Sequence, residues 1–153
     1  MGTFHLEATI DRPREDVFAV IADPTTMPRW YEAVQRVTTT STGPITAGAT
    51  YVITRSLPGG EVHNTVEITE YETNRCVTLE SRDGPTPFLY RYTLQPRPGG
   101  VTGITLDGRI SGTGLPAPLG AVDSLATRLF KHGMRRNLDE LRRIIESAPT
   151  RQE

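Results

Sequence analysis

Six short runs rich in β-branched and aromatic residues follow one another between residues 34 and 110, and this pattern constrains the fold more than any other. Clusters of turn-forming residues separate the runs, so neighbouring runs lie within hairpin distance. Consecutive strands joined by short turns pair antiparallel. We therefore expect an antiparallel meander with strands at 34–40, 50–56, 61–71, 75–81, 88–96 and 101–110.

Alternation within these runs predicts which side chains face the core. Successive residues of a strand point to opposite faces of a sheet, so residues two apart share a face. The expected inward sets are Val62, Asn64, Val66 and Ile68; Val77 and Leu79; Phe88, Tyr90, Tyr92 and Leu94; and Ile104, Leu106, Gly108 and Ile110. The polar members of these sets need hydrogen-bond partners wherever they are buried.

A further strand and a helix precede the meander. Residues 3–10 alternate apolar and polar side chains, which is typical of a strand with one buried face. Pro13 then stands at a favoured helix-start position, with acidic residues in the next turn, and Val17, Phe18 and Ile21 share one helical face. This helix is expected to end near Ala22.

The phrase "ADPTTMPRW", residues 22–30, predicts that the chain breaks and starts a second short helix. Asp23 can cap this helix with Pro24 at its first position. Pro28 limits it to about two turns, because proline cannot continue a helix interior. Met27 and the only tryptophan, Trp30, are expected to point inward, with Tyr31 beside them.

A long helical segment with one apolar face is expected at about 119–147. At 100° per residue one arc collects Val122, Ala126, Leu129, Phe130, Gly133, Met134, Asn137, Leu141 and Ile144, widened by Leu138 and Ile145. Gly133 and Asn137 stand in the middle of this arc, where a packed helix normally carries leucine or isoleucine. Either they form the wall of a cavity, or Gly133 permits close helix–sheet approach and Asn137 bonds a strand backbone.

Chain length, net charge and cysteine content limit the class of protein. At 153 residues the chain is expected to form one domain, 1–148, followed by a polar tail, 149–153. Seventeen basic against eighteen acidic residues give no charge-based case for nucleic acid or an anionic membrane. A single cysteine, the absence of an apolar leader and the lack of a membrane-length apolar run predict a cytoplasmic location without integral membrane association.

No pattern of metal, nucleotide or thiol chemistry emerges. The three histidines are far apart in sequence, so we expect no metal site. The sequence "GTGLPA" at 112–117 matches the G-x-G-x-x-A pattern of a dinucleotide-binding loop. It does not stand in a βαβ unit, and the prolines in and after it lack the backbone N–H groups that such a loop uses. Cys76 alternates with the inward Val77 and is expected to face outward as a plain thiol.

The order of elements, together with "TIDRPREDVFAVIADPTTMPRW" and its Pro13, Asp23-Pro24 and Trp30, resembles the START/Bet v 1-like superfamily, in particular its polyketide cyclase/dehydrase and lipid-transport branch. The resemblance implies an α+β helix-grip fold: a seven-stranded curved antiparallel sheet wraps a long C-terminal helix, with two short helices after strand one. It also implies an apolar cavity between sheet and helix, and ligands such as lipids, polyketides or aromatic compounds.

We therefore expect a carrier or sequestering protein for an apolar small molecule, without a cofactor. A polyketide cyclase/dehydratase-type enzyme using the same cavity and a protein-interaction module with a vestigial cavity are the alternatives. An enzyme would draw on Tyr90, Tyr92 and Asn64, with Arg55 as a further donor and Glu70 as a possible base. The predicted ligand-binding residues are Met27, Trp30, Asn64, Val66, Phe88, Tyr90, Tyr92, Leu106, Leu129, Gly133 and Asn137.

Overall fold

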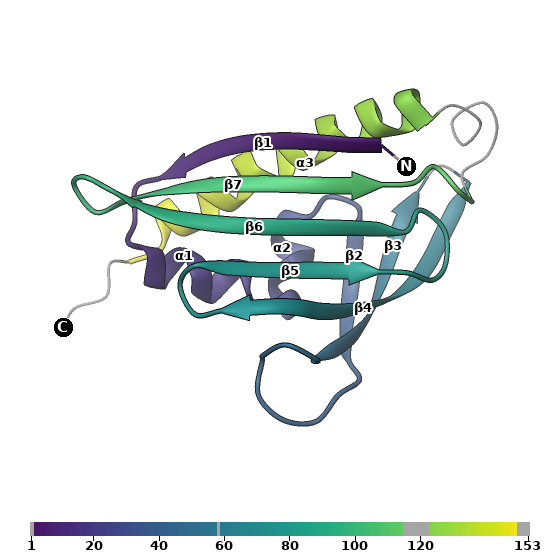
Figure 1. The fold of residues 1–153 in the computed structure, drawn as a ribbon, viewed down its shortest axis with the longest axis horizontal. Helices are drawn as coiled ribbons and strands as arrows, with labels where there is room; N and C mark the ends of the chain where they lie inside the picture. Colours follow the sequence, from purple (N-terminus) through teal and green to yellow (C-terminus); the bar gives the residue numbers. More distant parts are fainter. Residues whose placement is uncertain (1, 58, 115–122, 150–153) are drawn as a thin grey trace.

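The computed structural model, which describes residues 2–57, 59–114 and 123–149, contains the expected seven-stranded antiparallel sheet (Figure 1). The strand order is β1-β7-β6-β5-β4-β3-β2, so the meander is closed at one edge by the first strand. The helix-grip prediction is confirmed. The strands are β1 Gly2–Ile10, β2 Val34–Thr39, β3 Thr50–Leu57, β4 Gly60–Glu72, β5 Cys76–Ser81, β6 Phe88–Arg97 and β7 Val101–Ile110.

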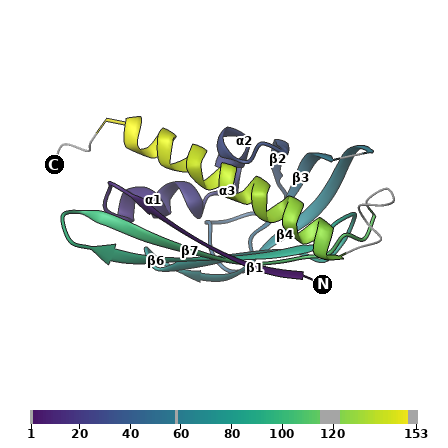
Figure 2. The same ribbon diagram turned by 90° about the horizontal axis from the view of Figure 1, so that it is seen from above.

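The helices of the described residues lie on one face of the sheet (Figure 2). They are α1 Arg14–Ile21, the 3₁₀ turn η1 Pro24–Thr26, the short α2 Met27–Trp30 and the long α3 Asp123–Ser147. The predicted start of the last helix, 119–122, and the tail at 150–153 lie outside the described residues. In the part of the chain that is described, no helix is both long and apolar enough to span a membrane.

The break between α1 and α2 has the local causes that the sequence predicted. The Asp23 carboxylate accepts a hydrogen bond from the backbone N–H of Thr25 at 3.0 Å, which caps η1. The Thr26 hydroxyl donates to the carbonyl of Val20 at 2.8 Å and so ties the new turn to the end of α1. The chain therefore turns sharply and places Trp30, 2% exposed, in the core.

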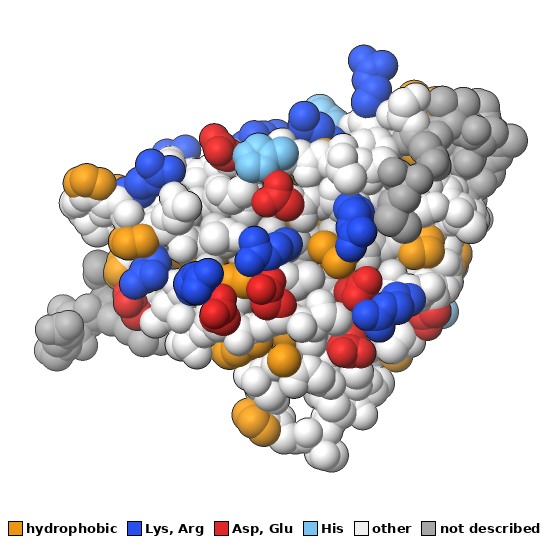
Figure 3. Space-filling view, viewed as in Figure 1, with side chains coloured by type: hydrophobic (Ala, Val, Ile, Leu, Met, Phe, Trp, Pro, Cys, Tyr) orange, Lys and Arg blue, Asp and Glu red, His pale blue; other side chains and the backbone are white. Residues whose placement is uncertain are grey.

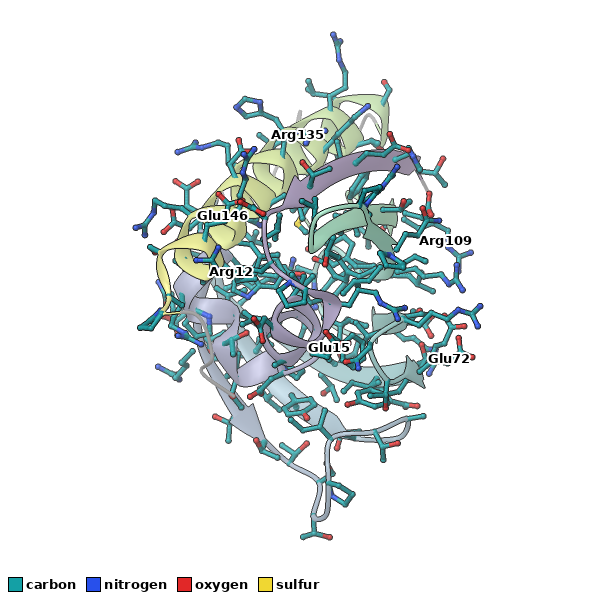
Figure 4. The ribbon with its side chains drawn as sticks, turned by 90° about the vertical axis from the view of Figure 1, so that its left-hand side faces the viewer. Arg12, Glu15, Glu72, Arg109, Arg135 and Glu146 are labelled. Atoms are coloured by element: carbon teal, nitrogen blue, oxygen red, sulfur yellow. The ribbon has the colours of Figure 1, made fainter. Side chains whose placement is uncertain are left out.

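The C-terminal end of α3 is hydrogen-bonded to the segment that follows β1. The Arg12 guanidinium donates to the carbonyl of Glu146 at 2.6 Å, and the backbone N–H of Asp11 donates to the Glu146 carboxylate at 2.9 Å. Figure 4 shows Arg12 and Glu146 side by side at this end of the molecule, with Arg135 farther along the helix. Arg135 donates to the carbonyl of Glu7 on β1. These contacts hold the helix along the β1 edge of the sheet.

The inward sets predicted from alternation form the core, apart from Val62, which is only partly buried. The opposite face of the sheet carries basic and acidic side chains interspersed with one another (Figure 3). On α3, Ala126, Leu138 and Leu141 are at most 1% exposed, whereas Leu125 is 40% and Leu129 42% exposed. The two leucines of the C-terminal half are therefore buried, whereas the two of the N-terminal half are partly exposed to solvent.

Candidate functional site

A cavity of about 520 Å³ lies between residues 129–137 of α3 and the concave face of the sheet. The space is large enough for a small molecule, and most of its wall is apolar or aromatic, as ligand pockets usually are. Its wall is drawn from α2, the chain before β2, β3, β6 and α3, and includes Met27, Tyr31, Val34, Ile53, Arg55, Phe88, Tyr90, Leu129, Phe130, Gly133, Met134 and Asn137.

Gly133 leaves space in the helix face above this cavity. A Cβ atom added to Gly133 would meet no atom within 4 Å, apart from those of its chain neighbours and its own helix. Close approach of helix and sheet is therefore not the reason for this glycine. The missing side chain adds volume to the cavity, in agreement with the first of the two interpretations of the sequence.

Asn137 agrees with the first interpretation of its position, whereas the backbone group that it bonds lies in a turn and not in a strand. It lines the cavity, and its side-chain oxygen accepts a hydrogen bond from the backbone N–H of Glu32 at 3.0 Å. The Glu32 carboxylate lies 3.4 Å from the guanidinium of Arg136, and both side chains are largely exposed. These two contacts join α3 to the chain between α2 and β2 at the mouth of the cavity.

The structure brings six of the predicted ligand-binding residues to the cavity wall: Met27, Phe88, Tyr90, Leu129, Gly133 and Asn137. Val66, Tyr92 and Leu106 are fully buried in packed core and do not line the cavity. Asn64 is buried behind Arg55. Trp30 borders a smaller groove of about 340 Å³ that is lined by residues of α2 and α3. The roles of all these residues in binding remain predictions.

Tyr92 does not line the cavity and is instead bonded to Tyr31. Its hydroxyl is hydrogen-bonded to the hydroxyl of Tyr31, and burial raises the pKa of both phenols. Tyr31 itself lines the cavity, beside Tyr90. Tyr90 is 3% exposed and makes no hydrogen bond to another described residue, and burial raises its pKa to about 12. At neutral pH Tyr90 is therefore a neutral phenol able to donate a proton in a hydrogen bond.

Arg55 is one of the wall residues that the prediction of ligand-binding residues missed, although it was expected as a further donor for an enzyme. It is 4% exposed, and its guanidinium donates to the Asn64 side-chain oxygen at 2.7 Å, the Pro85 carbonyl at 2.9 Å and the Thr86 hydroxyl at 2.6 Å. Burial lowers the pKa of Arg55, although arginine stays charged in proteins. The alternation of Tyr51, Ile53 and Arg55 along β3 carried the signal, because the first two face the core.

The loop between β5 and β6 is shaped to meet Arg55. Thr86 adopts a left-handed φ of 49°, which is unusual for a β-branched residue, and it is completely buried. Its backbone N–H donates to the carbonyl of Thr113 at 2.6 Å. Gly84 approaches β4 so closely that a Cβ would lie 2.7 Å from the carbonyl oxygen of His63. Strain of this kind is kept only where the surroundings enforce it.

Glu70 is not available as a base for the cavity, and that expectation was wrong. A register shift between Ile68 and Glu70 moves Glu70 opposite Thr78, so that it points to the outer face. There it accepts hydrogen bonds from Arg91 and Thr78, each at 2.8 Å. Cys76 also belongs to this outer cluster, as expected, and burial raises its pKa to about 11.

The Glu70–Arg91 pair predicts a specific acid sensitivity. Hydrogen bonding from Arg91 is the main cause that lowers the Glu70 pKa from 4.5 to about 2. A lowered carboxyl pKa stabilises the fold above pH 4.5, and this contribution disappears as the pH falls to about 2. Because the pair is about 40% exposed, solvent limits the contribution to about 1 kcal/mol or less.

Denaturation of wild type and Glu70→Gln by urea should therefore give unfolding free energies that differ most at neutral pH and converge as the pH approaches about 2. Glu67→Gln, a neighbouring strand residue whose carboxylate has no such partner in the described part of the chain, is the matched control. A difference that is constant from neutral to acid pH would contradict the assignment.

Metal chemistry has one geometric candidate among the described residues. Ligand atoms of Glu70, Glu72 and Cys76 lie within 4.8 Å of one another on the outer face. Glu70 is already bound to Arg91, and the raised pKa of Cys76 opposes the thiolate that a metal needs. His5 and His63 are exposed on the outer face, and His132 lies exposed at the cavity rim.

The sequence profile of the family described as polyketide cyclase/dehydrase and lipid transport matches residues 1–146. The chain belongs to this family. Among curated proteins, none shows a significant sequence match. The family includes both transport and cyclase functions in its description, so membership supports a ligand-binding or cyclase role at a coarse level.

Solved structures show the same fold at low sequence identity. The protein TTHA0849 from Thermus thermophilus is 16% identical with a TM-score of 0.79, covering 97% of this chain and 100% of its own. A START superfamily protein from Mycobacterium smegmatis is 11% identical with a TM-score of 0.79, covering 94% and 97%. The Zhui aromatase/cyclase from Streptomyces sp. R1128 is 11% identical with a TM-score of 0.75, covering 95% and 94%.

Proposed function

We propose that this protein binds an apolar small molecule in the cavity between α3 and the sheet and serves as a carrier or sequestering protein. The observation that supports this most is the cavity itself, about 520 Å³ in volume with a largely apolar and aromatic wall. A dry void of this size would cost about 12 kcal/mol at about 24 cal/mol per Å³, which is comparable with the stability of a whole domain. A cavity of this cost is expected to be occupied by water or ligand.

Native mass spectrometry of the freshly purified protein, followed by solvent extraction, tests the proposal. We expect a stoichiometric apolar adduct, or an apoprotein that takes up one molecule from a panel of fatty acids, sterols and aromatic polyketides. A folded protein that carries nothing and binds none of these compounds would contradict a carrier function. Such a result would favour the third possibility, a protein-interaction module.

A cyclase or dehydratase function is the second candidate, and the convergence of Arg55 and Tyr90 on the wall favours it. Both are hydrogen-bond donors, which an enolate formed during aldol cyclisation requires. A general base is harder to assign than the donors. Glu70 faces away from the cavity, and Glu32 is paired with Arg136 at the mouth. Conversion of an extracted compound into a cyclised or dehydrated product would favour the enzyme; its unchanged recovery would favour the carrier.

A further inference from the structure

Arg55 is a buried cation for which the described residues provide no matching anion. The described charged residues on the cavity wall are Arg55, Arg136 and Glu32. Glu32 lies 3.4 Å from Arg136, so this exposed pair neutralises itself at the mouth. Within the described part of the chain, no carboxylate forms an ion pair with the Arg55 guanidinium. The inner wall therefore holds one net positive charge.

Neutral acceptors position this charge without cancelling it. The partners of Arg55 are an amide oxygen, two backbone carbonyls and a hydroxyl, contributed by Asn64, Pro85 and Thr86. Asn64 is itself held in place, since its amide donates to the carbonyls of Asp83 at 2.8 Å and Pro85 at 2.9 Å. Burying a charged group with only dipoles around it is costly, because water is no longer available to solvate it.

Tyr90 adds a second donor next to this cation. The two side chains interact electrostatically, since the Arg55 charge acts to lower the Tyr90 pKa against the effect of burial. Both line the cavity, and the Arg55 guanidinium carbon lies 5.2 Å from the ring centre of Phe88, which stacks on Tyr90 at 4.5 Å. A guanidinium and a phenol that line one cavity are suited to an oxygen that carries negative charge.

We infer that the cavity is selective for apolar molecules that carry a carboxylate, with the carboxylate bound by Arg55 and Tyr90 and the apolar body lying under Gly133. This inference rests on the proposed function and specifies its ligand class. Charge-assisted hydrogen bonds are about twice as strong as neutral ones, so an acid should bind well ahead of the alcohol of the same shape. A purely apolar ligand would leave the Arg55 charge uncompensated.

The experiment compares acids with alcohols of equal size by calorimetric titration of the full chain. The probes are dodecanoic acid against 1-dodecanol and 2-naphthoic acid against 2-naphthalenemethanol, at about pH 8, where carboxylic acids are ionised. We expect wild type to bind at least one acid about tenfold or more tightly than its alcohol. This ratio is measured within one folded protein, so it does not depend on the stability of any variant.

Variants then assign the preference to its residues. Arg55→Met should reduce the acid-to-alcohol ratio to near one, and Tyr90→Phe should reduce it partly. Arg55→Lys retains the charge and should keep part of the preference. Arg91→Met is the matched control, because Arg91 occupies a strand but faces outward to Glu70, and it should leave the ratio unchanged.

Two results would overturn the inference while leaving the proposed function intact. One is equal affinity of wild type for acid and alcohol, and the other is an acid preference that survives in folded Arg55→Met. If wild type binds neither member of either pair and carries no extractable compound, the proposed function fails, and the inference fails with it.

Discussion

Gly133→Leu should reduce ligand binding by at least tenfold, a loss of about 1.4 kcal/mol in binding free energy, while the protein stays folded. A leucine side chain at this position points into the cavity, where the glycine leaves open space. The substitution does not destabilise the helix, because leucine has a higher helix propensity than glycine, by about 1 kcal/mol or less. Affinity is measured by calorimetry with the compound recovered by extraction or, for an apoprotein, with dodecanoate.

Gly133→Ala is the control for this experiment. It gains helix propensity in the same way but adds only one methyl group, which meets no atom of the neighbouring elements within 4 Å. We expect its affinity to stay within about threefold of wild type, a change of less than about 1 kcal/mol. Undiminished binding to a folded Gly133→Leu protein would place the ligand elsewhere.

Trp30→Ala should lower the free energy of unfolding by about 3–5 kcal/mol, a large share of the stability of a typical domain. The indole is 2% exposed and packs edge-on against Tyr31, with ring centres 4.3 Å apart. Its N–H donates to the Thr26 hydroxyl at 3.2 Å. Removing the indole therefore leaves a void in the core and removes one hydrogen bond to Thr26, whose hydroxyl keeps its bond to the Val20 carbonyl. Urea denaturation measures the change.

Arg29→Ala is the matched control, because Arg29 precedes Trp30 in α2 but is exposed. A surface substitution of this kind is expected to change stability by no more than about 0.5 kcal/mol. If Trp30→Ala cost as little as Arg29→Ala, the broken helix would not depend on this side chain for its packing.

Local patterns were sufficient to predict the elements and the core. The capping carboxylate of Asp23, with the prolines around it, predicted where one helix ends and the next begins. Alternation on β6 predicted the buried set from Phe88 to Leu94. These features depend on residues close in sequence, so their physical causes can be read without the folded chain.

The cavity required the fold. Tyr92 and Tyr90 have the same parity on β6, yet Tyr92 is bonded to Tyr31 and Tyr90 lines the cavity. Alternation cannot separate them, because the difference arises from where α2 crosses the sheet. Glu70 shows the same limit, since one register shift between Ile68 and Glu70 turned it to the outer face. A single irregular residue pair reverses every assignment that follows it.

The order of elements and the inward faces of the strands followed from the sequence alone, because each depends on local backbone geometry and side-chain spacing. The burial of Arg55 in the cavity wall, with no carboxylate partner among the residues that the structure describes, became visible only in the folded chain. That arrangement joins β3, β4 and the loop between β5 and β6, segments up to 31 residues apart in the chain. The charge that selects the proposed ligand therefore arises from long-range packing, which no local pattern encodes.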